Sequence, residues 1–422
     1  MKEVLFLVHR IPYPPNKGDK IRSFHLLKYL SQSYRVYLGA FVDDPEDWRH
    51  APEVKKYCAS TCLLPLNSLR GKLRGLQGLV TGEALTVPYY SDRRMAAWVE
   101  QVMGRASIHA IVVFCSGMAQ YAENYPGVTR VIDFVDVDSD KWRQYAENKP
   151  WPFSWIYRRE ADRLLRFDRR MASRFDRAVF ISAREADLFT RLAPETRERV
   201  SVVENGVDTE FFSNAEDHPN PYPPEAVILA FTGAMDYWAN VDAVTWFADK
   251  VFPGLRRRFV RLEFFVVGAR PGEAVRALGR REGITVTGTV PDVRPYLRHA
   301  HLIVAPLRIA RGVQNKVLEA MAMGKPVLAS PAAMEGIDAE AGLDVMIASR
   351  PEEWQSAALA LLGDAARPPV SAANRRFVER RYSWDKSLEP LGTLLDRFAG
   401  SELGRLRRPR TGEPHGWGEQ TP

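Results

Sequence analysis

Cysteine is scarce in this sequence, with three residues among 422. Three thiols cannot build a disulfide framework, and Cys58 and Cys62 could face each other only if their stretch is helical. Cys115 stands in an apolar segment. We therefore expect reduced thiols and a reducing compartment.

Long apolar runs are also missing, since nowhere do about 18 consecutive apolar residues occur. The first expected strand, Val4–Val8, is too short for the apolar core of a signal peptide. The sequence has no zinc-type Cys/His spacing and no base-stacking motif. The net charge of +7 nevertheless suits anionic ligands or an anionic membrane surface. These features predict a cytoplasmic protein without a spanning helix and without nucleic acid as a partner.

Alternating strand and helix patterns are what the sequence does contain. With 422 residues, 45% of them apolar, the chain is long enough for two or three α/β domains. The expected strand Val227–Thr232 is followed by Gly233, and this strand-glycine rhythm is repeated downstream as in Rossmann-like domains. Residues 218–224 contain four prolines and have a linker composition.

The stretch from His301 to Pro331 is the most informative part of the chain. It predicts a buried strand, a loop, a helix from Asn315 to Met323 that exits at Gly324, and another buried strand. Cations in the loop and the first helical turn, next to free backbone N–H groups, favour a phosphate or diphosphate. Lys316 and Glu319 are three residues apart and share a helix face. They could bind a diphosphate and a ribose, or they could form a solvated surface pair.

The run PLRIARGVQNKVLEAMAMGKPV resembles the nucleotide-sugar signature of family-4 glycosyltransferases, which have the GT-B fold. The resemblance implies two Rossmann-like, doubly wound α/β domains that face each other across a cleft. The acceptor-side domain would span residues 1–213 and be completed by a helix over 383–400. The donor-binding domain would span 225–380, and residues 403–422 would be a disordered tail.

The resemblance also implies the donor contacts. Arg308 and Lys316 would be catalytic cations on the diphosphate, and Glu319 would bind the ribose. Arg311 stands where the family usually has a second Glu, which bears on contacts to the sugar. The other expected donor-binding residues are Gly312, Val313, Gln314, Asn315 and Gly233.

The first domain offers weaker candidates. Gly18 and Asp19 occupy the first βα loop, which in the family faces the donor and acceptor but could here be a plain turn. Ser116 follows another expected strand. The acidic cluster Asp133, Asp136, Asp138 and Asp140 could bind a metal, or Asp138 or Ser139 could cap the next helix. The resemblance argues against a metal, places Asp136 at the position of the family's active-site His, and leaves Asp138 as a second candidate.

The implied function is that of a retaining glycosyltransferase that needs no cofactor and uses a UDP- or GDP-linked sugar. Together with residues 308–323, the segment 131–142 resembles glycosyltransferases of the exosortase/PEP-CTERM exopolysaccharide system. The acceptor would then be a polyprenyl-linked glycan, reached by peripheral association with the anionic inner membrane. A nucleotide-sugar epimerase and a catalytically silent partner subunit are the alternatives.

Two segments could contact that membrane. Arg70, Lys72 and Arg74 lie among leucines, in a segment that could equally be a covering helix of the first domain. The Arg-rich helix expected over Trp155–Arg177 could be a lipid-phosphate site, although its alternating charges favour a solvated face with ion pairs.

Overall fold

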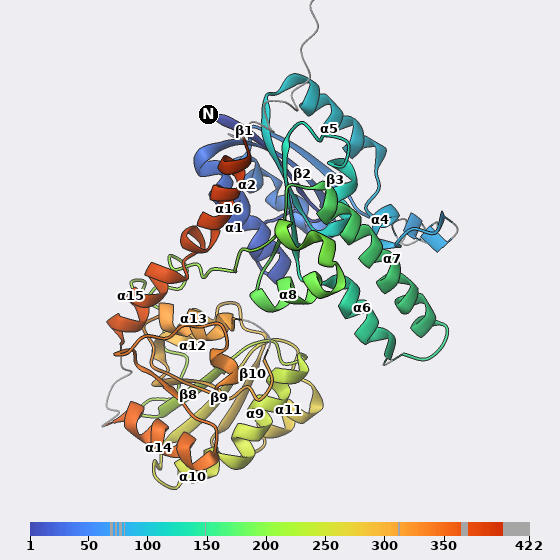
Figure 1. The fold of residues 1–422 in the computed structure, drawn as a ribbon. Coiled ribbons are helices and arrows are strands. Elements are labelled where there is room, and N and C mark those ends of the chain that lie inside the picture. Colours follow the sequence, from blue (N-terminus) through green and yellow to red (C-terminus); the bar gives the residue numbers. More distant parts are fainter. Residues whose placement is uncertain are drawn as a thin grey trace, which may run out of the picture. The chain divides into compact units, whose positions relative to one another are not determined.

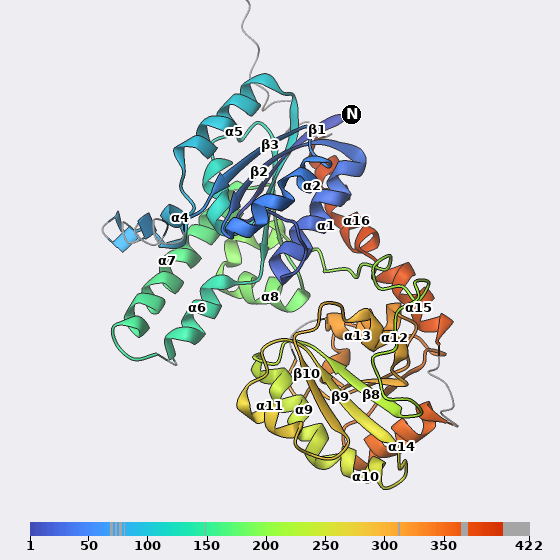
Figure 2. The same cartoon turned by 180° about the vertical axis from the view of Figure 1, so that it is seen from behind.

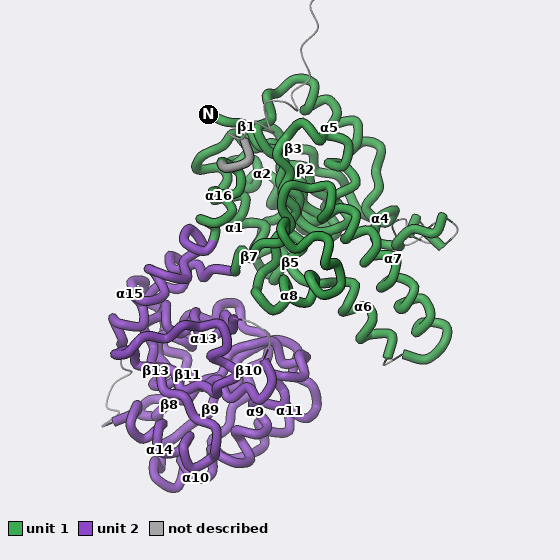
Figure 3. Tube along the Cα trace, in the orientation of Figure 1, with its two compact units in different colours: residues 1–204, 388–422 green, residues 205–387 purple. Residues whose placement is uncertain are grey.

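The structure is a computed structural model that describes residues 1–67, 71, 74, 75, 78, 79, 81–147, 149–310, 313–363 and 370–399. The chain divides into two compact units, shown in different colours in Figure 3. Unit 1 consists of Met1–Glu204 together with the chain from Leu388 onward, and unit 2 consists of Asn205–Ser387. The expected tail, 403–422, lies outside the described residues.

A seven-stranded sheet with the order β3-β2-β1-β4-β5-β6-β7 forms the centre of unit 1 (Figure 1). All of its strand pairs are parallel. Its strands are β1 (Lys2–Val8), β2 (Tyr34–Val42), β3 (Ser60–Pro65), β4 (Ile108–Phe114), β5 (Thr129–Val135), β6 (Arg177–Phe180) and β7 (Val200–Val202). The inner strands read as continuous apolar runs because both faces of the sheet are covered.

Helices cover both faces of this sheet, as Figures 1 and 2 show from opposite sides. Alternate residues of β1, such as Leu5 and Leu7, pack in one core cluster with Met95 and Val99 of α5. The helices of unit 1 are α1 (Gly18–Ser33), α2 (Ala51–Lys55), α4 (Thr86–Tyr89), α5 (Arg93–Arg105), α6 (Asp138–Glu147), α7 (Phe153–Arg174), α8 (Ala183–Leu192) and, from Leu388 onward, α16 (Trp384–Ala399).

The last helix, α16, is held to the start of the chain within unit 1. Asp396 pairs with Lys2 at 2.7 Å and accepts a hydrogen bond from Tyr34 at 3.3 Å. Leu388, Leu391 and Leu395 are buried, as expected for a helix that presents one apolar face to the core.

Unit 2 is built around a six-stranded sheet with the order β10-β9-β8-β11-β12-β13, again with parallel pairs throughout. Its strands are β8 (Val227–Thr232), β9 (Leu262–Val267), β10 (Ile284–Gly288), β11 (Leu302–Ala305), β12 (Val327–Ala329) and β13 (Val345–Ile347). Its helices are α9 (Trp238–Lys250), α10 (Phe252–Arg256), α11 (Glu273–Leu278), α12 (Arg294–His299), α13 (Asn315–Ala322), α14 (Pro351–Leu362) and α15 (Ala372–Arg381). Two parallel doubly wound sheets confirm the expected α/β fold class.

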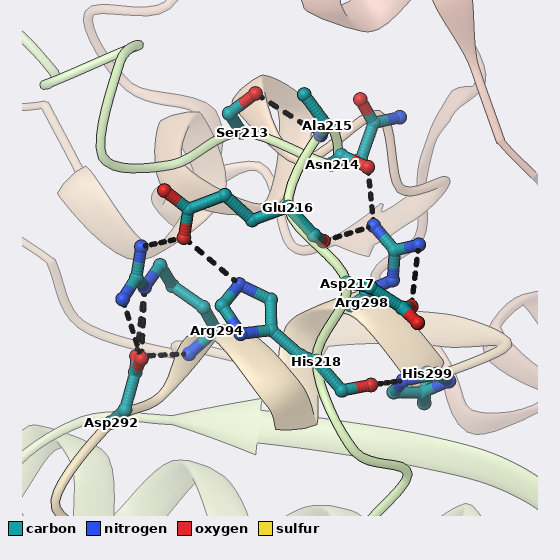
Figure 4. A network of polar contacts seen from close by, with 10 residues as sticks. All are labelled: Ser213, Asn214, Ala215, Glu216, Asp217, His218, Asp292, Arg294, Arg298 and His299. Carbon is teal, nitrogen blue, oxygen red and sulfur yellow. Dashed lines mark hydrogen bonds and ion pairs between the residues drawn. The ribbon is translucent and has the colours of Figure 1, made fainter.

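The segment that enters unit 2 is fixed to it despite its proline-rich composition. Figure 4 shows residues of the stretch 214–218 in polar contact with Arg294, Arg298 and His299 of α12. Arg294 pairs with Glu216 at 2.9 Å, and Arg298 donates to the Glu216 carbonyl at 2.7 Å. His299 Nε2 lies 2.7 Å from the His218 carbonyl oxygen. Within the proline-rich residues 218–224, the Tyr222 hydroxyl donates to the Tyr296 carbonyl at 2.6 Å, so the linker composition does not make this stretch free of unit 2.

The charged face expected on the Arg-rich helix is only partly solvated. Glu160 of α7 is buried and accepts hydrogen bonds from the backbone N–H of Leu85 and of Thr86, at 2.5 and 3.0 Å. Asp168 of the same helix is also buried. The interpretation of Glu160 as part of a solvated ion-pair face is wrong, because its carboxylate caps the start of α4. Asp162 of α7, in contrast, forms an exposed pair with Arg143 of α6.

Candidate active site

The candidate donor site in unit 2 lies where β8 and β9 end. Gly233 follows β8 and Gly268 follows β9, and a Cβ on Gly268 would lie 1.7 Å from the Gly233 carbonyl oxygen. A Cβ on Gly233 would lie 2.9 Å from Asn240 Nδ2 and 3.1 Å from Lys316 Nζ. The two glycines thus let the turns approach each other and leave room for a side chain arriving from α13, at the sheet edge where ligands of doubly wound folds bind.

Lys316 supplies that side chain. It stands in the first turn of α13, and its Nζ donates to Asn240 Oδ1 at 2.5 Å. Asn240 is fixed in turn because its Nδ2 donates to the Ala234 carbonyl at 2.9 Å. The Lys316 ammonium also lies 4.2 Å from the centre of the Phe231 ring. It is therefore a positioned cation and not a solvated surface lysine.

Glu319 lies on the same helix face as Lys316 and is electrostatically coupled to it. Burial disfavours the charged ammonium and lowers the pKa of Lys316 to about 7, although the Glu319 charge opposes this change. Burial likewise raises the pKa of Glu319 to about 7, opposed by Lys316. Both groups can therefore change protonation near neutral pH when an anionic or hydroxyl-bearing ligand arrives.

Arg308 has a partner that the sequence analysis did not name. Its Nε donates to Asp242 at 2.8 Å, and its Nη2 contacts the other carboxylate oxygen of the same residue. Asp242 belongs to α9, as does Asn240, so this helix holds both cations of the site. The side chain of Arg308 remains 55% exposed, which leaves part of its guanidinium accessible to a ligand.

The remaining expected donor residues lie on the loop before α13. Arg311 and Gly312 are outside the described residues. Gln314 is the N-cap residue of α13, whose first residue is Asn315. The Gln314 side chain makes no capping hydrogen bond to the first turn of this helix. Val313 lies against Gly336: a Cβ placed on Gly336 would be 3.0 Å from Val313 Cγ2. The helix N-terminus, Lys316 and Arg308 together can attract a diphosphate.

Gly233→Ala is expected to lower the rate of the sugar transfer implied by the sequence resemblance by about 100-fold, because the new methyl group would push Lys316 Nζ from its place and sub-ångström positioning governs rate. The measurement is steady-state kinetics with a circular dichroism check on folding. Gly272→Ala is the matched control, since its Cβ would meet nothing within 4 Å. Equal losses in both variants would contradict this account of Gly233.

In unit 1, the first βα loop is tied together by Asp19. Gly18 is the first residue of α1, and Asp19 accepts from Arg10 at 2.9 Å and lies 3.2 Å from His9 Nε2. Burial acts to raise the pKa of the Asp19 carboxyl, but the His9 and Arg10 contacts outweigh it and hold this pKa below its usual range. His9 stacks on Phe114 with ring centres 5.7 Å apart. Asp19 thus orients a histidine that the sequence analysis missed.

The ends of β4 and β5 are conformationally strained. Cys115 and Val135 have φ of +79° and +69°, values that are costly for residues with a Cβ and more so for a β-branched one. Ser116 is buried and hydrogen-bonds to Asp168, whose pKa burial raises well above its ordinary value. Strain of this kind is commonest at functional sites.

The acidic cluster at the end of β5 separates into two parts. Asp133 is buried and pairs with Arg22 at 2.8 Å, whereas Asp136 and Asp138 both contact Lys141, at 2.6 and 3.1 Å. Within the described part of the chain, no group of three or more acidic, His or Cys side chains is arranged to hold a metal ion. Asp138 begins α6 and is half-buried.

Of the expected basic patch, only Arg74 is described, and it donates to the Ser91 carbonyl; Arg70 and Lys72 lie outside the described residues. None of the helices that the structure describes has the length and apolar character needed to cross a membrane.

Comparison with known proteins finds a family match over most of unit 2. Residues 226–364, which contain the whole Lys316 and Arg308 environment, match the family model "Glycosyl transferases group 1". No curated protein matches the sequence.

Solved structures match almost the whole chain. HepE of Anabaena, crystallised with UDP, is 15% identical with a TM-score of 0.59, over 94% of this chain and all of its own. A glycosyltransferase of Rickettsia africae is 14% identical with a TM-score of 0.62, over 95% of this chain and 100% of its own. WaaG, a glycosyltransferase of lipopolysaccharide biosynthesis, is 17% identical with a TM-score of 0.55, over 94% of this chain and 98% of its own. The fold is thus GT-B, and residues 226–364 of unit 2 match the group 1 glycosyltransferases.

Proposed function

We propose that the protein transfers a sugar, with retention of anomeric configuration, from a nucleotide diphosphate sugar to a hydroxyl of a lipid-linked glycan. The observation that carries the donor half is the positioned Lys316 ammonium, held by Asn240 at the N-terminus of α13 with Glu319 on the same face. A diphosphate is the natural partner of this cation, and Glu319 can accept hydrogen bonds from a ribose diol.

The chemical difficulty of this reaction is the charge that develops on the departing diphosphate. Lys316, Arg308 and the first-turn N–H groups of α13 are already in place to stabilise that charge, so little reorganisation is needed at the moment of bond cleavage. Arg308 would bind the diphosphate while Asp242 fixes the orientation of its guanidinium. Arg311 and Gly312 on the adjoining loop remain proposed donor contacts.

The acceptor half of the proposal assigns unit 1 residues. Asp136, in the place of the family's histidine, and Asp138 are the candidates beside the reacting centre, with Gly18, Asp19 and Ser116 on the acceptor side. The strained backbone at Cys115 and Val135, next to these residues, supports a functional assignment. The resemblance of residues 131–142 to exosortase-associated enzymes supports a polyprenyl-linked acceptor in exopolysaccharide assembly at the inner membrane.

UDP is the first donor nucleotide to test, because HepE was crystallised with UDP and with UDP-glucose. At 100 times its dissociation constant a ligand adds about 2.7 kcal/mol to the unfolding free energy. For a chain of this length the melting temperature should rise by about 3 °C. We expect UDP to give this shift in the wild type and none in Glu319→Ala. No shift with UDP or GDP at millimolar concentration would count against the proposed donor site.

The acceptor is tested separately by incubating the protein with radiolabelled nucleotide sugar and membranes, and following label into the lipid-extractable fraction. We expect incorporation that Lys316→Met abolishes. Release of free sugar alone, with no label in lipid under any membrane source, would contradict a lipid-linked acceptor while leaving donor binding intact.

A further inference from the structure

Helices α6 and α7 form a hairpin whose end carries large aromatic side chains in solvent. Trp151 is 80% exposed, Tyr145 is 55% exposed, and Phe153 and Trp155 are each 54% exposed. These residues belong to the connection between the helices and to their adjoining turns. Between positions 141 and 163, six of 23 residues are aromatic, against 11% in the whole chain.

The hairpin is an ordered element and not a frayed end. The Trp142 and Tyr157 rings lie 5.2 Å apart and join the two helices, and Arg143 pairs with Asp162 at 3.4 Å. Farther along α7, Leu164 and Met171 are buried in the core of unit 1. The end of the hairpin extends beyond the sheet of that unit (Figures 1 and 2). The aromatic residues therefore stand at the projecting end of a packed helix pair.

Basic residues surround this aromatic end. Positions 141–163 contain six Lys or Arg and three Asp or Glu, and one of the acids, Glu160, is buried in backbone hydrogen bonds. A cavity of about 190 Å³ opens beside α7 and is lined by Arg163, Arg166 and Arg170. Gly82 and Glu83 form part of its opposite wall. The three arginines are spaced along one side of the helix and give it a positive character, to which Arg170 contributes less because it lies 3.7 Å from Glu123.

We propose that the α6–α7 hairpin is the membrane-docking element of this protein, and that its ligand is an anionic lipid surface. This inference deepens the proposed function and rests on its lipid-linked acceptor. Trp and Tyr side chains favour the boundary between lipid headgroups and acyl chains, and neighbouring Lys and Arg are attracted to anionic lipids.

The spacing along α7 fits this orientation. Arg163 follows Trp155 by eight residues, which is about 12 Å along a helix. Aromatic side chains that enter about 5–10 Å into the interface would leave Arg163 and Arg166 near the headgroup phosphates. The aromatic end would provide insertion, and the arginine-lined cavity would provide the preference for anionic lipid.

The test is sedimentation of the full-length protein with phosphatidylcholine vesicles and with vesicles that also contain phosphatidylglycerol, at low and high salt. Trp151→Ser/Phe153→Ser/Trp155→Ser should reduce binding to the anionic vesicles by roughly 100-fold. Arg163→Gln/Arg166→Gln should reduce it by about 30-fold and remove most of its salt dependence. Trp48→Ser, another exposed tryptophan of unit 1, is the matched control and should bind as the wild type does.

Three outcomes would overturn the proposal: wild type that ignores anionic vesicles at low salt, a triple aromatic variant that binds normally, or loss of binding in Trp48→Ser as well. The UDP-induced thermal shift is measured on every variant. An intact shift with absent vesicle binding would reject the docking element and leave the donor site standing, whereas a missing shift in the wild type would count against the proposed function itself. Light scattering of the wild type and the triple variant shows whether the aromatic end instead pairs two copies, which would also reject lipid docking.

Discussion

Lys316→Met is expected to lower the rate of sugar transfer by about 100- to 1000-fold, which is the usual loss when one charge-assisted donor at a developing anion is removed. The variant should remain folded, and its unfolding free energy should not fall. The reason is that burial lowers the pKa of Lys316 to about 7, so the folded protein holds this ammonium at a cost that methionine avoids. Single-turnover kinetics with donor and acceptor, combined with thermal unfolding, measure both effects.

Lys250→Met provides the control, because Lys250 is an exposed lysine at the end of α9, the helix that holds Lys316 through Asn240. It should leave both rate and stability unchanged. A normal rate in Lys316→Met would remove this lysine from the reaction.

The pKa values of Lys316 and Glu319 predict that nucleotide binding is coupled to proton uptake and release. The coupling becomes visible only when one of the two groups is removed. A bound diphosphate favours the charged form of Lys316, so binding above pH 7 takes up a proton, whereas a ribose bound to ionised Glu319 releases one. In the wild type the two effects oppose each other. In Glu319→Gln, UDP binding at pH 8 should show net proton uptake and should weaken as pH rises through 7. Calorimetry in buffers of different ionisation enthalpy detects the uptake, and its absence would contradict the lowered pKa of Lys316.

The donor half of the site could be read from sequence because its signals are local. The strand before Gly233, the cation in the first turn of α13 and the glycine exit at Gly324, where φ is +66°, all lie within short stretches. Apolar runs and turn residues carry this information directly. Asn240 and Asp242 could not be found in the same way. They stand 76 and 66 residues before the cations they hold. The sequence around a polar residue on a helix carries no signal of a partner that far away.

The acceptor half depends on such distant pairs even more. The sequence places Asp133 in one cluster with Asp136 and Asp138, but β5 ends at Val135, so Asp133 belongs to the strand whereas Asp136 and Asp138 belong to the following bend and to α6. Asp133 turns inward to Arg22, which is 111 residues away in the chain. The pattern Ser-x-x-Glu at Ser182–Glu185 follows a strand and predicts a capping box, and it shows a milder version of the same effect. Ser182 caps α8 as expected, but the Glu185 carboxylate accepts from the Val137 backbone at 2.8 Å.

Arg22→Met should reduce the unfolding free energy of unit 1 by about 3–5 kcal/mol, the usual cost of leaving a buried carboxylate without its partner. The Arg22 guanidinium donates to Asp133 and to the Val203 carbonyl, each at 2.8 Å, and both side chains of the pair are almost fully buried. Methionine preserves much of the volume and removes the charge. Denaturant unfolding, monitored by hydrogen exchange, can resolve the unfolding of unit 1 from that of unit 2.

The size and the pH dependence of the loss in unfolding free energy distinguish an unpaired buried charge from general misfolding. Burial raises the pKa of Asp133 above its ordinary value even though Arg22 acts to lower it, so the pKa should rise further in Arg22→Met. The folded state then binds more protons than the unfolded state, and stability must fall as pH rises from about 4 through the folded pKa. The defect should therefore be smaller at pH 5 than at pH 8, and Arg22→Met/Asp133→Leu should recover much of it. Arg169→Met, which breaks the exposed pair with Glu195, should cost less than about 1 kcal/mol at either pH. An Arg22→Met defect that is equal at both pH values, and that the double variant does not relieve, would show that Arg22 stabilises unit 1 by packing and backbone contacts and not by neutralising Asp133.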